Sequence, residues 1–221
     1  MRISIIVPAF NQGQYLAQTL DSIFAQTIRP HEVIVINDGS QDETQEIASS
    51  YPVKLINQVN KGLASARNTG IMNMTGDFFL PLDSDDLLME NAVEKILEVI
   101  KFTDADIVAP SFKCFGINND TVVLMPNPML EDFKVANRIG YFSAIRRDAL
   151  LEIGGYSPRM VFGYEDLHLW INLLSRGKRI VTMKDILILY RTKENSMFTD
   201  SLKHHDELMG QIYKDFPDFH A

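Results

Sequence analysis

Three carboxylates fall within four positions at the end of an apolar run, in the segment Leu-Pro-Leu-Asp-Ser-Asp-Asp over residues 80–86. Asp83 and Asp85 lie two positions apart, so an extended segment points both side chains the same way and a turn lets them converge. Mg²⁺ and Mn²⁺ prefer oxygen ligands and bind diphosphates through one or two protein carboxylates. Acids are also favoured at a helix start, here a helix over residues 87–101. Taken alone, the cluster leaves a metal site and a helix start equally open.

Polar or turn-forming residues follow two earlier apolar runs of the chain. The first run ends in Pro-Ala-Phe-Asn at residues 8–11, and the second ends in Asn-Asp-Gly-Ser at residues 37–40. In open parallel sheets, ligands bind outside the carboxyl ends of the strands. We therefore expect both segments to share one rim with residues 83–85. Asp38 alone would suit an ordinary turn, but its place beside the other strand ends favours contact with a ligand.

A helix rich in small residues is predicted after Gly62, in the segment Gly-Leu-Ala-Ser-Ala-Arg-Asn-Thr-Gly over residues 62–70. It places Arg67 within its first two turns. Arg67 can pair with Asp83 or reach a phosphate through its planar guanidinium group. The third interpretation is an ordinary surface ion pair, worth up to ~1 kcal/mol.

Apolar runs alternate with helical patterns along the first half of the chain, which predicts an α/β fold with a buried parallel sheet. The expected strands cover residues 3–7, 32–36, 53–56, 77–82 and 106–109. The expected helices cover residues 14–26, 42–50, 63–74 and 87–101. Residues 112–137 have no such pattern and predict short strands with a long loop, where specificity often resides. Later ordered segments are expected over residues 140–145, 148–153, 165–174 and 185–190.

Composition limits the class of protein. The chain has 221 residues, of which 46% are hydrophobic and 23% charged, and this suits one domain with a sizeable core. A formal net charge of −8 argues against nucleic-acid binding. The single cysteine, Cys114, excludes an internal disulfide and fits a reducing compartment. The first ten residues are too short an apolar run for a signal peptide or a membrane span, and no later run is long enough.

Five segments, in order, resemble the family 2 glycosyltransferases, which have the GT-A fold, over about residues 3–192. The resemblance covers an opening strand at 3–11, a nucleoside-binding strand end at 33–40, an Ala-Arg-Asn-x-Gly helix within 62–70, an Asp-x-Asp motif at 83–85 and a Glu-Asp motif at 165–166. It implies a mostly parallel, Rossmann-like sheet flanked by helices, with a smaller acceptor-side region. It also implies one GT-A domain over residues 1–221, with a nucleotide-sugar-binding half at 1–110 and an acceptor-binding half at 111–221.

The resemblance assigns roles at the donor end of the site. Asp38 would accept a hydrogen bond from the base, Asp83 would contact the ribose or the metal, and Asp85 would bind the metal, Mg²⁺ or Mn²⁺. The ion would bridge the diphosphate and stabilise charge on the leaving nucleotide. Arg191 would contact a phosphate in a loop that includes residues 195–197. The implied nucleotide-binding residues are Pro8, Ala9, Phe10, Asn11, Asp38, Arg67, Asp83, Ser84 and Arg191.

At the acceptor end, the resemblance makes Asp166 the general base of an inverting transfer. One carboxylate suffices for this, because only the acceptor hydroxyl must lose a proton. Glu165 would hold the acceptor or orient Asp166. The acidic pair alone would equally suit a helix start. His168 departs from the family pattern, and it is interpreted as an ordinary helix histidine rather than as a metal or acceptor ligand.

Two further features narrow the expected activity. The Gln-x-x-Arg-Trp motif of processive family members is absent, and the only tryptophan, Trp170, is expected to pack in the core. His204 and His205 are expected to be exposed, with a late metal ligand as the alternative.

We therefore expect transfer of a single sugar from a nucleotide-diphosphate sugar, most simply a UDP-sugar, in glycan or cell-envelope polysaccharide synthesis. The acceptor would be a sugar, a lipid-linked sugar or another hydroxyl. The expected location is cytoplasmic, and attachment to the inner face of a membrane stays compatible with the sequence. Two alternatives stay open: a non-catalytic or partner-dependent nucleotide-sugar-binding module, and a sugar-phosphate nucleotidyltransferase.

Overall fold

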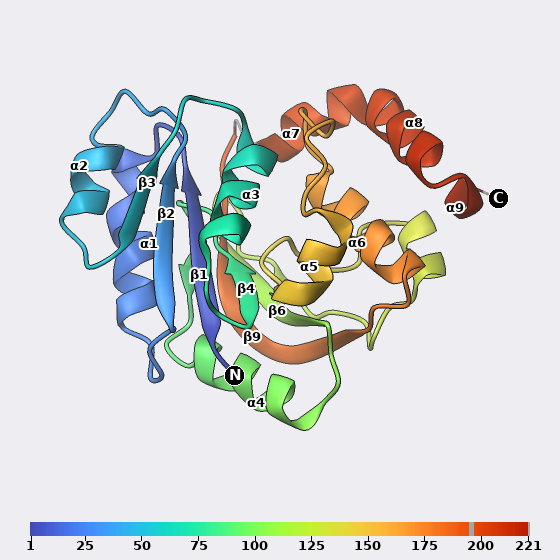
Figure 1. Cartoon of the computed structure of the whole chain (residues 1–221), viewed down its shortest axis with the longest axis horizontal. Helices are drawn as coiled ribbons and strands as arrows, with labels where there is room; N and C mark the ends of the chain where they lie inside the picture. Colours follow the sequence, from blue (N-terminus) through green and yellow to red (C-terminus); the bar gives the residue numbers. More distant parts are fainter. Residues whose placement is uncertain (195–196, 221) are drawn as a thin grey trace.

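The fold is built on one mixed sheet with helices on both faces, as seen in a computed structural model that describes residues 1–194 and 197–220 (Figure 1). The strand order is β3-β2-β1-β4-β8-β6-β9-β5, with β7 paired to β6. The strands are β1 (Ile3–Ala9), β2 (Glu32–Asn37), β3 (Lys54–Asn57), β4 (Phe78–Pro81), β5 (Leu87–Leu88), β6 (Ile107–Gly116), β7 (Thr121–Val122), β8 (Ala144–Arg146) and β9 (Ile180–Thr192). The helices are α1 (Gly13–Phe24), α2 (Thr44–Ser49), α3 (Leu63–Asn73), α4 (Ala92–Phe102), α5 (Arg147–Ile153), α6 (Glu165–Ser175), α7 (Met197–Ser201), α8 (His205–Asp215) and α9 (Pro217–His220), with 3-10 turns at Leu130–Lys134 and Leu202–His204.

The first four strands bring the predicted rim together. β1 pairs in parallel with β2 and β4, and Ala9 lies opposite Asn37 at the carboxyl ends of β1 and β2. The amide of Asp38 donates to the carbonyl of Ala9 at 2.9 Å, which holds the two strand ends side by side. The expectation that these strands end on one rim, followed closely by residues 83–85, is confirmed.

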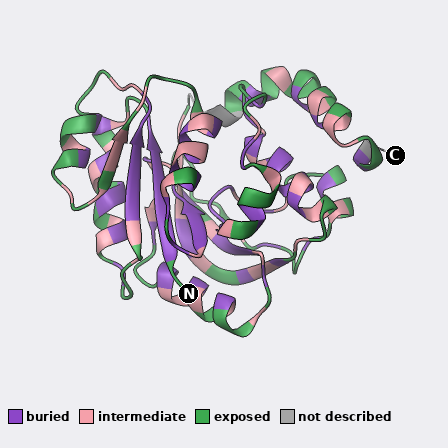
Figure 2. Ribbon diagram, in the orientation of Figure 1, coloured by how far each residue is buried: buried purple, intermediate pink, exposed green. Residues whose placement is uncertain are grey.

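Side-chain alternation along the strands divides the core into two layers. In β1, Ile6 faces the layer that contains α3, α5 and α6, whereas Ile5 and Val7 face the layer of α1 and α4. The central strands are buried along their length, and α8 presents much exposed surface (Figure 2). Trp170 is fully buried, which confirms its predicted packing role.

The sheet is mostly parallel, as expected, and its antiparallel pairings involve the short strands β5, β7 and β8. β8 runs antiparallel to β4 and β6, and β5 runs antiparallel to β9. Leu87 and Leu88 pair with Leu189 and Ile188, so they form the edge strand β5 and the predicted helix over 87–101 begins only at Ala92. The cause is non-local, because an apolar pair that suits a helix suits a sheet edge as well.

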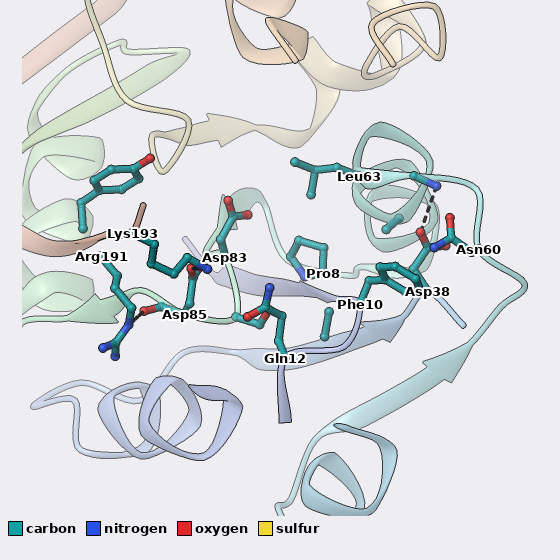
Figure 3. Close-up of a pocket in the computed structure, with 15 residues that line it drawn as sticks. Pro8, Phe10, Gln12, Asp38, Asn60, Leu63, Asp83, Asp85, Arg191 and Lys193 are labelled. Carbon is teal, nitrogen blue, oxygen red and sulfur yellow. Dashed lines mark hydrogen bonds and ion pairs between the residues drawn. The ribbon is translucent and has the colours of Figure 1, made fainter. Parts of the chain in front are cut away.

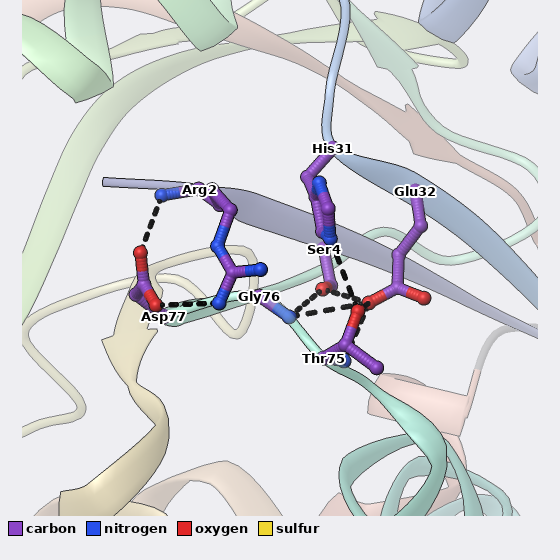
Figure 4. A network of polar contacts seen from close by, with 7 residues as sticks. All are labelled: Arg2, Ser4, His31, Glu32, Thr75, Gly76 and Asp77. Atoms are coloured by element: carbon purple, nitrogen blue, oxygen red, sulfur yellow. Dashed lines mark hydrogen bonds and ion pairs between the residues drawn. The ribbon is translucent and has the colours of Figure 1, made fainter.

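A polar network joins residues at the amino ends of β1 and β2 and just before β4 (Figure 4). One carboxylate oxygen of Glu32 accepts hydrogen bonds from the hydroxyls of Ser4 and Thr75 at 2.6 and 2.9 Å. Arg2 and Asp77 form an ion pair next to it at 3.0 Å. These contacts join β1, β2 and the approach to β4, so we assign them a structural role.

Gly70 allows α3 to pack closely on β1. A Cβ atom at Gly70 would lie 2.4 Å from Cγ2 of Ile6, so we expect Gly70→Ala to destabilise the fold by about 1–3 kcal/mol. Gly210 in α8 is the matched control, because a Cβ atom there meets nothing within 4 Å. Gly210→Ala should stabilise by up to about 1 kcal/mol. Urea denaturation measures both changes, and equal effects would contradict the packing argument.

No helix within residues 1–194 and 197–220 combines the length and the apolar character that a membrane crossing requires.

Candidate active site

Two adjoining cavities open at the carboxyl ends of the strands. The strand-end cavity, of about 400 Å³, is lined by the ends of β1 and β2 and by the residues after β4. The helix-start cavity, of about 520 Å³, is lined by the start of α6 and by part of the 112–137 segment. The two cavities share Leu63, Asp83 and Tyr190. In Figure 3, Asp85 and Lys193 lie on one side of the strand-end cavity and Asp38 and Asn60 on the other.

Most of the predicted nucleotide contacts line the strand-end cavity, namely Pro8, Ala9, Phe10, Asp38, Asp83, Ser84 and Arg191. Asn11 has a different place. It has a left-handed φ of 52°, its amide donates to Ser40 Oγ at 3.0 Å, and its own side-chain oxygen accepts from the amide of Gln41 at 2.8 Å. Asn11 therefore ties the end of β1 to the end of β2.

Asp38 is held by the segment that leads into α3. Its Oδ1 accepts hydrogen bonds from Gln58 Nε2 at 2.7 Å and from the amide of Lys61 at 3.0 Å, and its Oδ2 accepts from the amide of Gly62 at 2.9 Å. The side chain is almost fully buried, at 3% exposure. This carboxylate fixes the loop over 58–62 against the end of β2, which shapes one wall of the cavity.

The aspartates of residues 83–86 have separate partners. Asp83 pairs with Arg67 at 2.8 Å, and Asp86 accepts from the Tyr141 hydroxyl at 2.5 Å and from the amide of Arg191 at 2.7 Å. Asp85 pairs with Lys193 Nζ at 2.5 Å. Burial raises the pKa of Asp83 to about 6, and the charge of Asp85 adds to this against the effect of Arg67. Burial, followed by the neighbouring aspartates, also raises the pKa of Asp86 well above its usual range.

Arg67 is the buried centre that joins the two cavities. Its NH2 group contacts Asp83 and its NH1 group contacts Glu165 Oε1 at 2.6 Å. The guanidinium carbon lies 4.8 Å from the ring centre of Tyr141 and 5.4 Å from that of Tyr156. Of the predicted alternatives, the ion pair with Asp83 is the one observed. The Arg67 side chain is almost entirely buried, and it lines the helix-start cavity rather than the strand-end cavity.

Asp166 faces the helix-start cavity, while Glu165 turns towards Arg67. The amide of Leu167 donates to Asp166 Oδ1 at 2.7 Å, and Asn137 Nδ2 donates to Oδ2 at 2.8 Å. Burial, with the adjacent charge of Glu165, raises the pKa of Asp166 to about 7, although these hydrogen bonds oppose the rise. Such a carboxylate is suited to exchange a proton near neutral pH.

The backbone immediately before this acidic pair is strained. Tyr164 has a left-handed φ of 58°, which is uncommon for a residue with a side chain, and its hydroxyl contacts His205 Nδ1 at 2.9 Å. Strain of this kind persists where surrounding contacts hold it and is common at functional sites. The contact with His205 attaches α8 to the start of α6.

Arg191 lies at the opposite wall of the strand-end cavity. Its Nε donates to the carbonyl of Asp85 at 2.8 Å and its NH2 group donates to Gln18 Oε1 at 2.9 Å. The guanidinium lies between the rings of Tyr15 and Phe115, at 4.5 and 4.3 Å from their centres. The predicted phosphate-contacting loop continues through residues 195 and 196, which lie outside the described residues.

The histidines have structural contacts. His168 is buried and contacts Asp215 Oδ2 at 3.1 Å, and burial lowers the pKa of its imidazole despite that neighbour. His204 stacks on Phe162 with ring centres 3.9 Å apart, and only His205 of the adjacent pair lines the helix-start cavity. The described part of the chain contains no group of three or more His, Cys, Asp or Glu residues placed to hold a metal.

The sequence matches the model of a known family over most of its length. The matching family is described as Glycosyl transferase family 2, and the match covers residues 4–160. The chain belongs to this family. Its glycosyltransferase membership supports an enzyme and favours sugar transfer over the alternative of a nucleotidyltransferase.

Several glycosyltransferases are similar along the chain. "Glycosyltransferase GlyG" of Streptococcus pneumoniae is 27% identical over 88% of this chain and 72% of its own length. An uncharacterized glycosyltransferase of Haemophilus influenzae is 32% identical over 90% of this chain and 72% of its own length. "Glycosyltransferase GlyA" of S. pneumoniae is 39% identical over 52% of this chain, which corresponds to 17% of that protein.

Solved structures of TarS from S. aureus confirm the GT-A fold. TarS residues 1–349 in complex with UDP-GlcNAc gives a TM-score of 0.78 at 21% identity, over 90% of this chain and 61% of that chain. A longer TarS chain gives a TM-score of 0.81 over 97% of this chain and 39% of its own length. This glycosyltransferase therefore spans less than two thirds of either TarS chain.

Sequence reasoning missed three side chains that shape the site, namely Asn137, Tyr141 and Lys193. Asn137 lies in the 112–137 segment, where specificity was expected, but its contact with Asp166 was not predicted. Lys193 lies two positions after Arg191, and this spacing at a strand end could have indicated that both side chains reach the same site.

Proposed function

We propose that the chain transfers a single sugar from a UDP-sugar to an acceptor hydroxyl, with inversion at the anomeric carbon. The carrying observation is that the two cavities meet at Asp83, with Asp85 in the strand-end cavity and Asp166 in the helix-start cavity. A donor in the first cavity would present its sugar to a hydroxyl held in the second. The TarS complexes with UDP and UDP-GlcNAc support a uridine nucleotide in a fold of this kind.

The residues at the donor end fit a divalent cation. The Asp85 carboxylate lines the cavity and already bonds the side-chain amine of Lys193, so its oxygens are reachable by a cation. Asp85, with Asp83 beside it, would hold Mg²⁺ or Mn²⁺, which would offset charge on the departing diphosphate. Arg191 and Lys193 add positive charge at the same wall, in a chain whose formal net charge is −8.

At the acceptor end, Asp166 would accept the proton of the attacking hydroxyl. The amide of Leu167 and the side chain of Asn137 each hold one oxygen of the carboxylate, so the group is fixed in orientation. Each oxygen has a second lone pair for the hydroxyl. Glu165 is committed to Arg67, so we assign it to positioning α6 rather than to proton transfer. The acceptor class and a place in glycan or cell-envelope synthesis stay predictions.

Thermal stability with nucleotides tests the donor assignment. We expect UDP with Mn²⁺ to raise the melting temperature, and GDP, CMP or dTDP to raise it less. A ligand at 100 times its dissociation constant stabilises by about 2.7 kcal/mol. The measurement is a melting curve for each nucleotide with and without Mn²⁺.

Asp85→Ala is the variant that isolates the metal-dependent part of this shift. It should lose the Mn²⁺-dependent increase, whereas Asp148→Ala, at an exposed position on α5, should keep it. Retention of the full Mn²⁺-dependent shift in Asp85→Ala would remove the metal assignment. Absence of a shift with every nucleotide would favour the alternative of a partner-dependent module.

A further inference from the structure

Lys193 bonds the carboxylate of Asp85, the residue that the proposed function assigns to a metal ion. Its Nζ lies 2.5 Å from Asp85 Oδ2, and both side chains line the strand-end cavity. Lys193 is 27% exposed and Asp85 is 16% exposed, so the pair is open to the cavity without being freely solvated. Figure 3 shows the lysine side chain extending across the cavity wall to Asp85.

The neighbouring carboxylates have partners that a ligand cannot easily displace. Asp83 is paired with Arg67, which is fully buried between two tyrosine rings. Asp86 is itself buried and accepts from Tyr141 and from a backbone amide. Among these three aspartates, Asp85 is thus the one whose cationic partner stands at the cavity surface.

Arg191 and Lys193, the two basic side chains on this wall of the strand-end cavity, differ in how firmly their contacts hold them. The Arg191 guanidinium is fixed by two hydrogen bonds and by the rings of Tyr15 and Phe115. The Lys193 ammonium has its ion pair with Asp85 and lies 5.1 Å from the centre of the Tyr15 ring. A lysine ammonium is a compact charge on a flexible four-carbon stem, so it can move while its backbone stays in place.

We propose that Lys193 is a built-in counter-ion that occupies Asp85 while the donor site is empty and turns to the diphosphate when a divalent cation takes Asp85. This inference rests on the proposed function. An ammonium and a divalent cation held by the same carboxylate repel each other, so Lys193 on Asp85 opposes binding of a metal ion there. An incoming diphosphate supplies a second group of negative oxygens, to which the displaced ammonium can bind.

The consequence is that metal binding depends on the nucleotide. Without nucleotide, Mn²⁺ must displace Lys193 and leave it without its carboxylate. With UDP present, the Lys193 ammonium can bind the diphosphate instead of Asp85, so it no longer competes with Mn²⁺ for that carboxylate. Because such coupling is reciprocal, Mn²⁺ should increase the affinity for UDP by the same factor as UDP increases the affinity for Mn²⁺.

Isothermal titration calorimetry with Mn²⁺ and UDP tests this role for Lys193. Lys193→Met keeps the stem and removes the charge, so we expect it to bind Mn²⁺ alone roughly fivefold more tightly than the wild type. We expect UDP in saturating Mn²⁺ to bind it roughly fivefold more weakly. Lys193→Arg, which keeps the charge, should resemble the wild type in the absence of nucleotide. Lys95→Met, on α4 and paired only at 3.6 Å with Glu98, is the matched control and should change neither affinity.

The outcomes separate this inference from the function on which it rests. If the wild type binds UDP with Mn²⁺ and Lys193→Met binds Mn²⁺ alone with unchanged affinity, the counter-ion role is overturned and the donor site stands. If the wild type binds no nucleotide under any condition, both fall. Melting curves of each variant without ligand show whether a change in affinity arises from unfolding.

Discussion

Asp166→Asn is expected to lower the rate of sugar transfer by roughly 10²- to 10⁴-fold while UDP binding is retained. Asn has nearly the same shape and can still contact the Leu167 amide and the Asn137 side chain, but it cannot accept a proton. The measurement is the transfer rate alongside UDP affinity. Asp148→Asn, at the exposed start of α5, is the control and should keep the wild-type rate.

The pH dependence of the same reaction gives a second measure of Asp166. Because burial raises its pKa to about 7, the carboxylate is mostly protonated below that pH and cannot act as a base. The wild-type rate should therefore rise as pH increases through about 7, and the residual rate of Asp166→Asn should lose this step. A variant that transferred sugar at the wild-type rate would remove the base assignment.

Arg67→Met is expected to destabilise the fold by about 3–5 kcal/mol, the largest stability effect we predict. The side chain is fully buried and binds both Asp83 and Glu165, so its removal leaves two carboxylates facing each other without a cation. Solvent screens these buried carboxylates only weakly, so leaving them without a cation lowers the free energy of unfolding. Urea denaturation with an unchanged m value measures the loss.

Two comparisons make the Arg67 prediction specific. Arg2→Met breaks an ion pair of similar length, 3.0 Å, whose partners are about half exposed, and it should destabilise the fold far less than Arg67→Met. Adding Asp83→Asn and Glu165→Gln to Arg67→Met should recover part of the loss, because the buried charges are then removed together. An Arg67→Met effect no larger than that of Arg2→Met would contradict a buried charge centre.

The strand ends show how far sequence reasoning reaches. Continuous apolar runs predicted β1 to β4, and the rule that ligands bind at the carboxyl ends pointed to Asp38 and residues 83–85. The structure brings these residues to one cavity. These inferences succeeded because each depends on a short window of sequence and on the geometry common to parallel sheets.

The same reasoning from local sequence could not predict which residues the charged side chains would pair with. Arg67 could be assigned either to an ion pair or to a phosphate, and its second partner, Glu165, lies 98 positions away. The pairing of Leu87 with Leu189 likewise made an edge strand where the local pattern suited a helix. In each case the local sequence was compatible with two outcomes, and contact with a distant segment decided between them.

The sequence by itself determined the family, the α/β arrangement of the first half and the segments that carry the chemistry, because apolar periodicity and ordered motifs are properties of the chain. Only the tertiary structure decided which side chains pair: Arg67 with Asp83 and Glu165 and Lys193 with Asp85 as ion pairs, and Asn137 with Asp166 through a hydrogen bond. The physical reason is that ion pairs and hydrogen bonds act over a few ångströms, and folding sets those distances between residues far apart in the chain.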